Sequence, residues 1–225
     1  MYPSAVIFDF DGVIVDTEPL HYQAFQKILQ PLGLGYGWDD YVQTYMGFDD
    51  RDAFREVHQR AARPLTTARL EELVRQKADV FQEVIRTGVT PYPGVTTLIA
   101  KLYTDRTPLA ICSGALLSDI KPILEQLGIA HCFAQIVSAD DVSHSKPDPT
   151  SYHIAAERLS ALFPAILSSG GQIIAIEDTP AGISSAQGAG LNVIAVSNSY
   201  PPDKLQQANR VITSLEELQT DSSWL

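Results

Sequence analysis

Two aspartates, two residues apart, follow the first apolar run of the chain. Asp9 and Asp11 come directly after residues 5–8, in Phe8-Asp9-Phe10-Asp11-Gly12. Residues two apart in an extended chain point the same way, so both carboxylates can serve one site. One can attack phosphorus and form an aspartyl-phosphate, while the other works as general acid and base. Gly12 allows the turn beside a ligand. The alternative is a pair of loop acids that only caps a turn.

A hydroxyl and a glycine follow a second apolar run, residues 109–112. Ser113 and Gly114 can bind a phosphate oxygen through the side-chain O–H and the backbone N–H groups. A helix N-cap is the alternative for a serine at this position. We expect Cys112 to be a small core residue, because no base lies near it in the sequence.

A single lysine stands in the stiff segment Ser145-Lys146-Pro147-Asp148-Pro149. The ammonium group of Lys146 can offset the charge of a phosphate and keep a nucleophilic carboxylate ionised. An ordinary exposed surface charge is the alternative. The position of Lys146 just before two prolines does not by itself decide between them.

A second pair of acids, Glu177 and Asp178, ends the apolar run of residues 173–176. Mg²⁺ prefers oxygen ligands, commonly one or two carboxylates with water and substrate phosphate. Asp9 and Asp178 can supply these if their strands are neighbours. The alternative is a helix N-terminus, where the helix dipole stabilises acids.

Short apolar runs alternate with helical patterns over most of the chain, which predicts an α/β fold with a parallel sheet. Ligands bind at the carboxyl edge of such sheets, where all four groups above are expected. The predicted strands are residues 5–8, 109–112, 135–137, 173–176 and 192–196, and the predicted helices are 94–103, 118–127, 149–159, 181–189 and a short one near 214–217.

The segment from residue 16 to residue 88 has no strand-like run. Its apolar residues recur at helical spacing, as in Leu70, Leu73, Val74 and Phe81. We therefore predict two domains, an α/β core of residues 1–15 and 89–225 and a helical cap of residues 16–88.

Composition narrows the possible partners. The net charge of −11 disfavours nucleic acid, and no apolar run approaches the roughly 18 residues of a membrane span. No basic region precedes the first apolar stretch, so a secretory signal is not expected. The two cysteines form no metal-ligand pattern, and a reducing cytoplasm is predicted.

The four motifs together, in this order, resemble the haloacid dehalogenase-like superfamily, subfamily IA. The run from Asp9 to His21 is most similar to the β-phosphoglucomutase/CbbY-like phosphatase branch. The resemblance implies a Rossmann-like parallel-sheet core with an inserted all-helical cap domain of the C1 type, closing over the carboxyl edge of the sheet.

The resemblance also implies a role for each residue. Asp9 matches the nucleophile and a metal ligand, and Asp11 matches the acid/base, with its backbone carbonyl also on Mg²⁺. An acid at the position of Asp11 separates the phosphotransferases from the dehalogenases, so dehalogenation is disfavoured. The other matches are Ser113 and Lys146 as catalytic and phosphate-holding residues, Gly12 and Gly114 beside the phosphate, and Asp178 with Glu177 at the metal.

Three cap residues are implied as substrate contacts, namely His21, Lys77 and Arg51. Lys77 falls near the position of a cap lysine in the sugar-phosphate mutases. The cap arginine is shifted by one residue, and Asp50 stands in its place, which speaks against mutase activity. For His21, a half-buried helix residue beside the hinge is the alternative.

The expected function is that of a Mg²⁺-dependent phosphatase acting on a small phosphorylated metabolite, such as a sugar phosphate. A β-phosphoglucomutase-type phosphomutase is the first alternative. A non-catalytic phosphate-binding module is the second, although all the catalytic acids are present. We expect a monomer without nucleic-acid or membrane partners, because the cap must move.

Overall fold

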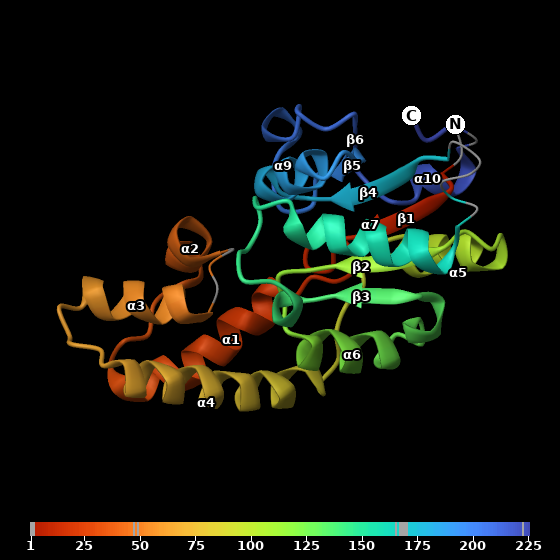
Figure 1. Ribbon diagram of the computed structural model, residues 1–225. Coiled ribbons are helices and arrows are strands. Elements are labelled where there is room, and N and C mark those ends of the chain that lie inside the picture. Colours follow the sequence, from red (N-terminus) through yellow and green to blue (C-terminus); the bar gives the residue numbers. More distant parts are fainter. Residues whose placement is uncertain (1–2, 47, 49, 165, 167–170, 222) are drawn as a thin grey trace. The chain divides into compact units, whose positions relative to one another are not determined.

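The computed structural model describes residues 3–46, 48, 50–164, 166, 171–221 and 223–225. The chain forms two compact units (Figure 1). The α/β unit comprises Met1–Asp16 and Thr90–Leu225, and the helical unit comprises Thr17–Val89.

Six parallel strands form the sheet of the α/β unit. They are β1 (Ala5–Phe8), β2 (Leu109–Cys112), β3 (Gln135–Val137), β4 (Ile173–Glu177), β5 (Asn192–Val196) and β6 (Arg210–Ile212). Their order is β3-β2-β1-β4-β5-β6. The chain adds β2 and β3 on one side of β1 and then β4, β5 and β6 on the other side. This confirms the five predicted strands and the parallel α/β fold. The short edge strand β6 was not predicted.

Helices connect the strands and cover the sheet. They are α5 (Val95–Thr104), α6 (Leu117–Gln126), α7 (Thr150–Leu162), α9 (Pro180–Gly188) and α10 (Glu217–Thr220). Short 3₁₀ turns lie at η3 (Ala130–Cys132), η4 (Ala139–Asp141) and η5 (Pro202–Lys204). Each predicted helix of the core is present, with ends that differ by a few residues. In Figure 1, α7 crosses the sheet on the near side of β1 and β2.

The sheet is buried on both faces, which explains its continuous apolar runs. All four residues of β1 are fully buried. One face packs on α7 and α9 through a cluster that includes Ile7, Ala110, Ala155 and Ile183. Because successive side chains alternate, Val6 and Phe8 point to the opposite face, where Phe8 meets the edge of the Phe133 ring.

The helical unit has its own apolar core. Its elements are α1 (Glu18–Leu29), η1 (Gln30–Leu32), α2 (Trp38–Asp40), the π-helical turn η2 (Tyr41–Tyr45), α3 (Asp50–Arg60) and α4 (Thr67–Ile85). Every regular element in the described part of this unit is a helix. Phe25 of α1, Phe54 of α3 and Leu73 of α4 meet in the core. The hydroxyl of Thr66 caps α4 by accepting from the Arg69 amide.

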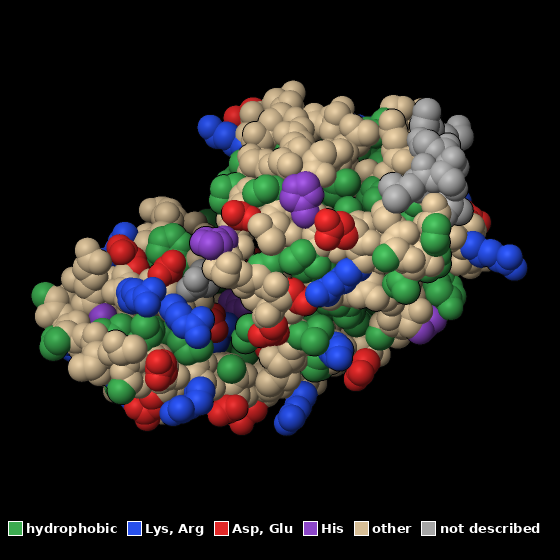
Figure 2. All heavy atoms as spheres, viewed as in Figure 1, with side chains coloured by type: hydrophobic (Ala, Val, Ile, Leu, Met, Phe, Trp, Pro, Cys, Tyr) green, Lys and Arg blue, Asp and Glu red, His purple; other side chains and the backbone are tan. Residues whose placement is uncertain are grey.

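Among the described helices, none is both long enough and apolar enough to cross a membrane. Lys and Arg side chains are interspersed with Asp and Glu over the face shown in Figure 2. This mixed surface accompanies the acidic net charge of the chain.

Candidate active site

The first acid of the sequence lies where β1 ends. Asp9 is 7% exposed, and its amide donates to the Ile176 carbonyl at 2.9 Å, which continues the pairing of β1 with β4. Its Oδ1 accepts from Lys146 Nζ at 2.8 Å. The nucleophile candidate is thus fixed by the sheet through its backbone and by a lysine through its side chain.

Lys146 directs its ammonium group at three acceptors. Besides Asp9 Oδ1, they are Glu177 Oε1 at 2.6 Å and the Cys112 carbonyl at 3.0 Å. An ammonium group has three N–H donors, so these bonds define its position completely. Burial alone would lower the pKa of Lys146, but the charges of Asp9 and Glu177 outweigh it and hold that pKa well above its usual value. The side chain of Lys146 is 14% exposed, and its ammonium group is paired with two carboxylates.

Glu177 is fully buried and uses both of its carboxylate oxygens within the protein. Oε1 accepts from Lys146 and from the Tyr152 hydroxyl, the latter at 2.8 Å. Oε2 accepts from the Asp178 amide at 3.1 Å and from the Thr179 hydroxyl at 3.2 Å. This carboxylate is well placed to hold Lys146 against Asp9.

Asp178 differs from Glu177, because only one of its two carboxylate oxygens accepts a hydrogen bond from a described residue. Oδ2 accepts from the Ser199 hydroxyl. Oδ1 is buried and has no hydrogen-bond partner among the described residues. Burying an unpaired carboxylate oxygen is unfavourable unless a ligand or ion satisfies it.

The three carboxylates form a group that could hold a divalent metal ion. Asp9, Glu177 and Asp178 each offer an oxygen, and these atoms lie within 4.8 Å of one another. An all-oxygen donor set of this kind suits a hard cation. The unpaired Oδ1 of Asp178 is the observation that favours a metal here over a purely structural cluster.

Burial also changes the proton affinities of the acids in this cluster. Burial raises the pKa of Asp9 to about 7; Lys146 opposes this, and Glu177 adds to it. Burial, followed by the charges of Asp9 and Glu177, raises the pKa of Asp178 well above its usual value. A bound cation would favour the ionised forms of both aspartates.

The loop after β1 places Asp11 and Gly12 beside the cluster. It is closed by bonds from the Gly12 amide to the Val15 carbonyl at 2.9 Å and from the Ile14 amide to the Phe10 carbonyl at 2.8 Å. Asp11 is half-buried in this loop. Gly12 has a φ of +80°, and a Cβ atom there would lie 1.8 Å from Asp178 Oδ2. Only glycine fits this position.

Ser113 and Gly114 follow β2 at the same edge of the sheet. Ser113 is 2% exposed, and its Oγ accepts from the Ala115 amide at 2.9 Å. Because that oxygen is the acceptor, its own proton is directed elsewhere and can be donated to a ligand. Gly114 is exposed, and a Cβ atom there would meet open space. Cys112 is buried, and burial raises the pKa of its thiol to about 11, which fits a core role.

The cap residues singled out by the sequence lie in the helical unit. Lys77 is 1% exposed, and its Nζ lies 2.8 Å from His21 Nδ1 and 2.8 Å from Asp50 Oδ1. Because an ammonium only donates, His21 Nδ1 must accept, which assigns its proton to Nε2. Burial, and then the charge of Lys77, lower the pKa of His21 well below its usual value. Arg51 is exposed on α3.

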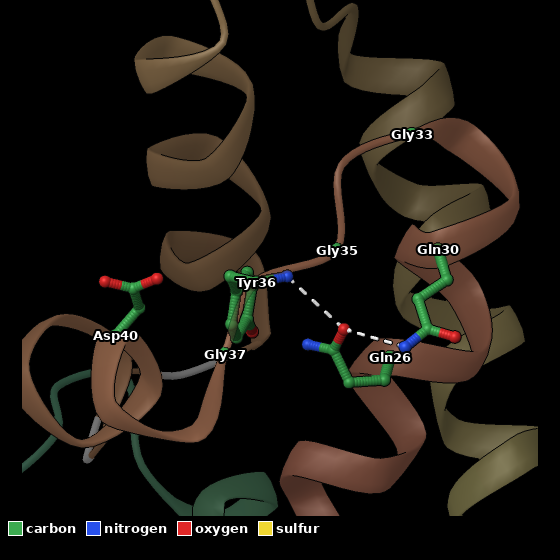
Figure 3. A pocket seen from close by; sticks show the side chains of 7 residues that line it. All are labelled: Gln26, Gln30, Gly33, Gly35, Tyr36, Gly37 and Asp40. Atoms are coloured by element: carbon green, nitrogen blue, oxygen red, sulfur yellow. Dashed lines mark hydrogen bonds between the residues drawn. The ribbon is translucent and has the colours of Figure 1, made fainter.

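A cavity of about 620 Å³ also lies in the helical unit, and none of the predicted site residues lines it (Figure 3). Hydrogen bonds connect the lining residues: Gln26 Oε1 accepts from the Tyr36 amide at 3.3 Å and from Gln30 Nε2 at 3.5 Å. This cavity contains no group of metal-ligating or nucleophilic side chains. The residues that line it are Gln26, Gln30, Gly33, Gly35, Tyr36, Gly37 and Asp40.

Three residues that support the cluster and the neighbouring loop were not found from the sequence. They are Tyr152, which bonds Glu177, Ser199, which bonds Asp178, and Asn198, which donates to the Gly12 carbonyl at 2.7 Å. Tyr152 lies inside a helix and carries no signal of its own. Asn198 and Ser199 follow a buried strand, so the argument used for Ser113 would have reached them.

Comparison with known proteins identifies the family of this chain. The family model described as haloacid dehalogenase-like hydrolase matches residues 6–196. Fructose-1-phosphate phosphatase YqaB of Escherichia coli is 30% identical over 86% of this chain and 96% of its own length. β-Phosphoglucomutase of Bacillus subtilis is 29% identical over 88% of this chain and 84% of its own.

The fold is shared with solved structures as well. CbbY from Rhodobacter sphaeroides, in complex with phosphate, superposes with a TM-score of 0.83 at 23% identity and covers 96% of each chain. With phosphatases and a phosphomutase among its relatives and a buried acidic cluster at the edge of its sheet, this chain is an enzyme that belongs to the haloacid dehalogenase-like hydrolase family.

Proposed function

We propose that the protein is a Mg²⁺-dependent phosphatase that hydrolyses a small phosphate monoester, with sugar phosphates as the substrate class. The observation that carries this proposal is the pairing of Asp9 with Lys146 next to the unsatisfied oxygen of Asp178. The relatives named fructose-1-phosphate phosphatase and β-phosphoglucomutase support the substrate class.

In the proposed reaction, Asp9 attacks phosphorus and forms a P–O bond as the bond to the alcohol breaks. Lys146 keeps Asp9 oriented and favours its ionised form, because Glu177 and the Cys112 carbonyl fix the ammonium group of Lys146. The Ser113 hydroxyl and the Gly114 amide are the proposed donors to the phosphate oxygens.

Asp11 is the proposed general acid and base. It donates a proton to the leaving alcohol and then removes one from the water that attacks the aspartyl-phosphate, which releases phosphate and restores Asp9. Asp9, Asp178 and the Asp11 carbonyl would hold Mg²⁺, with Glu177 beside them. When bound, the ion neutralises charge on the phosphoryl group.

The helical unit is the proposed cap, with His21, Lys77 and Arg51 as candidate substrate contacts. Pairing with Asp50 already neutralises Lys77 within that unit. This pairing supports hydrolysis over the phosphomutase reaction, in which a second phosphate group must also be bound. The buried free thiols of Cys112 and Cys132 are consistent with the reducing cytoplasm that we propose as the compartment.

A panel of phosphate monoesters, including fructose 1-phosphate and β-glucose 1-phosphate, tests the proposal. We expect phosphate release with Mg²⁺, no release with EDTA, and a preference for one or more sugar phosphates. Activity that is unaffected by EDTA would contradict the metal dependence. For β-glucose 1-phosphate with a bisphosphate primer, glucose 6-phosphate forming faster than free phosphate would favour the mutase.

A second test isolates Asp11. We expect Asp11→Ala to lower turnover of alkyl phosphates by roughly 10²–10⁴-fold, the usual effect of losing a general acid. For p-nitrophenyl phosphate, the rate of the first step should fall less, because p-nitrophenolate can leave without a proton. An unchanged rate with alkyl phosphates would remove Asp11 from this role.

A further inference from the structure

The loop after β5 reaches back to the acidic cluster. Its residues Asn198 and Ser199 follow Ser197 at the carboxyl end of β5, the strand that pairs with β4. Ser199 Oγ donates to Asp178 Oδ2, and Asn198 Nδ2 donates to the Gly12 carbonyl at 2.7 Å. One short segment therefore contacts both of the loops that carry the proposed metal ligands.

The bond from Ser199 divides the two oxygens of Asp178 into different roles. Oδ2 is occupied by the hydroxyl, whereas Oδ1 is buried without a partner among the described residues. A carboxylate held at one oxygen by a hydroxyl cannot rotate freely, so the same oxygen always remains for a ligand. Partners of this kind orient metal-ligating side chains and tune their affinity.

Packing around Gly12 shows how tightly these loops fit. A Cβ atom at Gly12 would lie 1.8 Å from Asp178 Oδ2 and 2.7 Å from Ser199 Oγ. The backbone that carries Asp11 thus rests directly on the pair formed by Asp178 and Ser199. The Asn198 amide secures that backbone from the carbonyl side.

We infer that Ser199 and Asn198 are positioning residues of the metal site. Ser199 holds Asp178 so that Oδ1 is available to Mg²⁺, and Asn198 holds the loop that presents Asp11. This inference rests on the proposed function, since it assumes that the cluster binds Mg²⁺. Neither residue touches the phosphoryl group in this scheme.

Metal binding without substrate tests the role of Ser199. The melting temperature of the full-length protein, first stripped with EDTA, is followed as Mg²⁺ alone is added, which gives an apparent dissociation constant. We expect Ser199→Ala to raise that constant by roughly 10- to 100-fold. Ser199→Thr, which keeps the hydroxyl, should bind Mg²⁺ nearly as wild type does.

The neighbouring Ser197 provides a matched control. It is also half-buried in this loop, and its amide, not its hydroxyl, bonds the Ile212 carbonyl at 3.0 Å. Ser197→Ala should leave the Mg²⁺ response within about twofold of wild type, the spread expected for a change that leaves the ligands in place. An equal response of Ser199→Ala and wild type would overturn this inference alone. A wild-type protein whose melting temperature ignores Mg²⁺ would contradict the proposed function and this inference together.

The choice of leaving group tests the role of Asn198. If Asn198 positions Asp11, Asn198→Ala should lower turnover of alkyl phosphates by about tenfold or more. The rate of p-nitrophenolate release from p-nitrophenyl phosphate should fall less. The Mg²⁺ response of Asn198→Ala should change less than that of Ser199→Ala. Equal losses for both leaving groups would contradict the positioning of Asp11.

Discussion

Tyr152 and Lys146 share one acceptor, the Oε1 atom of Glu177. The Tyr152 hydroxyl donates to it at 2.8 Å and Lys146 Nζ at 2.6 Å, while the face of the Tyr152 ring lies 4.9 Å from the same ammonium group. Tyr152 is fully buried. The lysine that bonds Asp9 therefore also contacts a buried carboxylate and the face of a buried aromatic ring.

Tyr152→Phe should weaken this arrangement without removing the ring. We expect a loss of about 1 kcal/mol in the free energy of unfolding, since one buried hydrogen bond is lost. Turnover should fall roughly tenfold, because Glu177 then holds Lys146 less firmly. Urea unfolding and steady-state kinetics measure the two effects. Tyr103→Phe, at a position that is 48% exposed, is the control and should change neither quantity.

Gly12→Ala should be more damaging than its size suggests. The new Cβ would collide with Asp178 Oδ2, and the φ of +80° is unfavourable for alanine. We expect more than about 1 kcal/mol of destabilisation, together with loss of activity and of the Mg²⁺-induced rise in melting temperature.

Gly128→Ala separates the two causes. Gly128 has a φ of +70°, but a Cβ atom there meets nothing within 4 Å. Backbone strain alone should lower the free energy of unfolding of this variant by about 1 kcal/mol, and the variant should retain full activity. Equal activities of Gly12→Ala and Gly128→Ala would show that the close packing of Gly12 on Asp178 is not needed for activity.

Asp9 should contribute less and less to the stability of the metal-free protein as the pH rises from about 4 to about 7. Burial raises the pKa of Asp9 from 3.8 to about 7 in the folded state, so the folded state binds more protons in this window. The contribution of Asp9 to the free energy of unfolding therefore falls with rising pH; it is complete below pH 3.8 and lost above pH 7.

Urea unfolding in EDTA across this window measures the effect. Asp9→Asn should flatten the slope, whereas the exposed Asp203→Asn should leave it unchanged. Equal slopes for Asp9→Asn and wild type would contradict the burial of an ionisable Asp9. Added Mg²⁺ should bind more tightly as the pH rises through about 7, because it competes with the proton on Asp9.

Asp50→Asn should destabilise the helical unit by leaving a buried cation without its carboxylate. Lys77 has a side chain that is 2% exposed, and its bond to Asp50 Oδ1 is 2.8 Å long. We expect a loss of about 2 kcal/mol in the free energy of unfolding.

Asp52→Asn is the matched control for that variant. Asp52 pairs with Arg55 at 2.9 Å, but both side chains are more than half exposed, and such pairs contribute little. Urea unfolding should show almost no change for this control. Equal losses of stability in the two variants would show that the Lys77–Asp50 pair does not stabilise the helical unit.

The strands and the acids could be predicted because they follow simple rules of position. Buried parallel strands are continuous apolar runs, and acids directly after such runs must lie at the carboxyl edge of the sheet. Asp9 and Asp178 are of this kind. The edge strand β6 was missed because it has three residues and begins with Arg210, which gives neither an apolar run nor an alternation.

The supporting residues could not be predicted in the same way. Tyr152 is one aromatic residue among many on helical faces, and only the packing of α7 on the sheet brings its hydroxyl to Glu177. Likewise, the burial of Lys77 against Asp50 depends on how α3 and α4 pack within the helical unit. Such contacts between distant segments follow from tertiary structure and have no local pattern.

Phosphate release by purified Asp9→Asn, measured with Mg²⁺ on the best sugar phosphate of the panel, tests the central claim most directly. The variant keeps the size of the side chain, and its folding can be verified by urea unfolding. If Asp9 is the nucleophile, release should fall to the rate of the buffer control. Release at the wild-type rate would contradict the assignment.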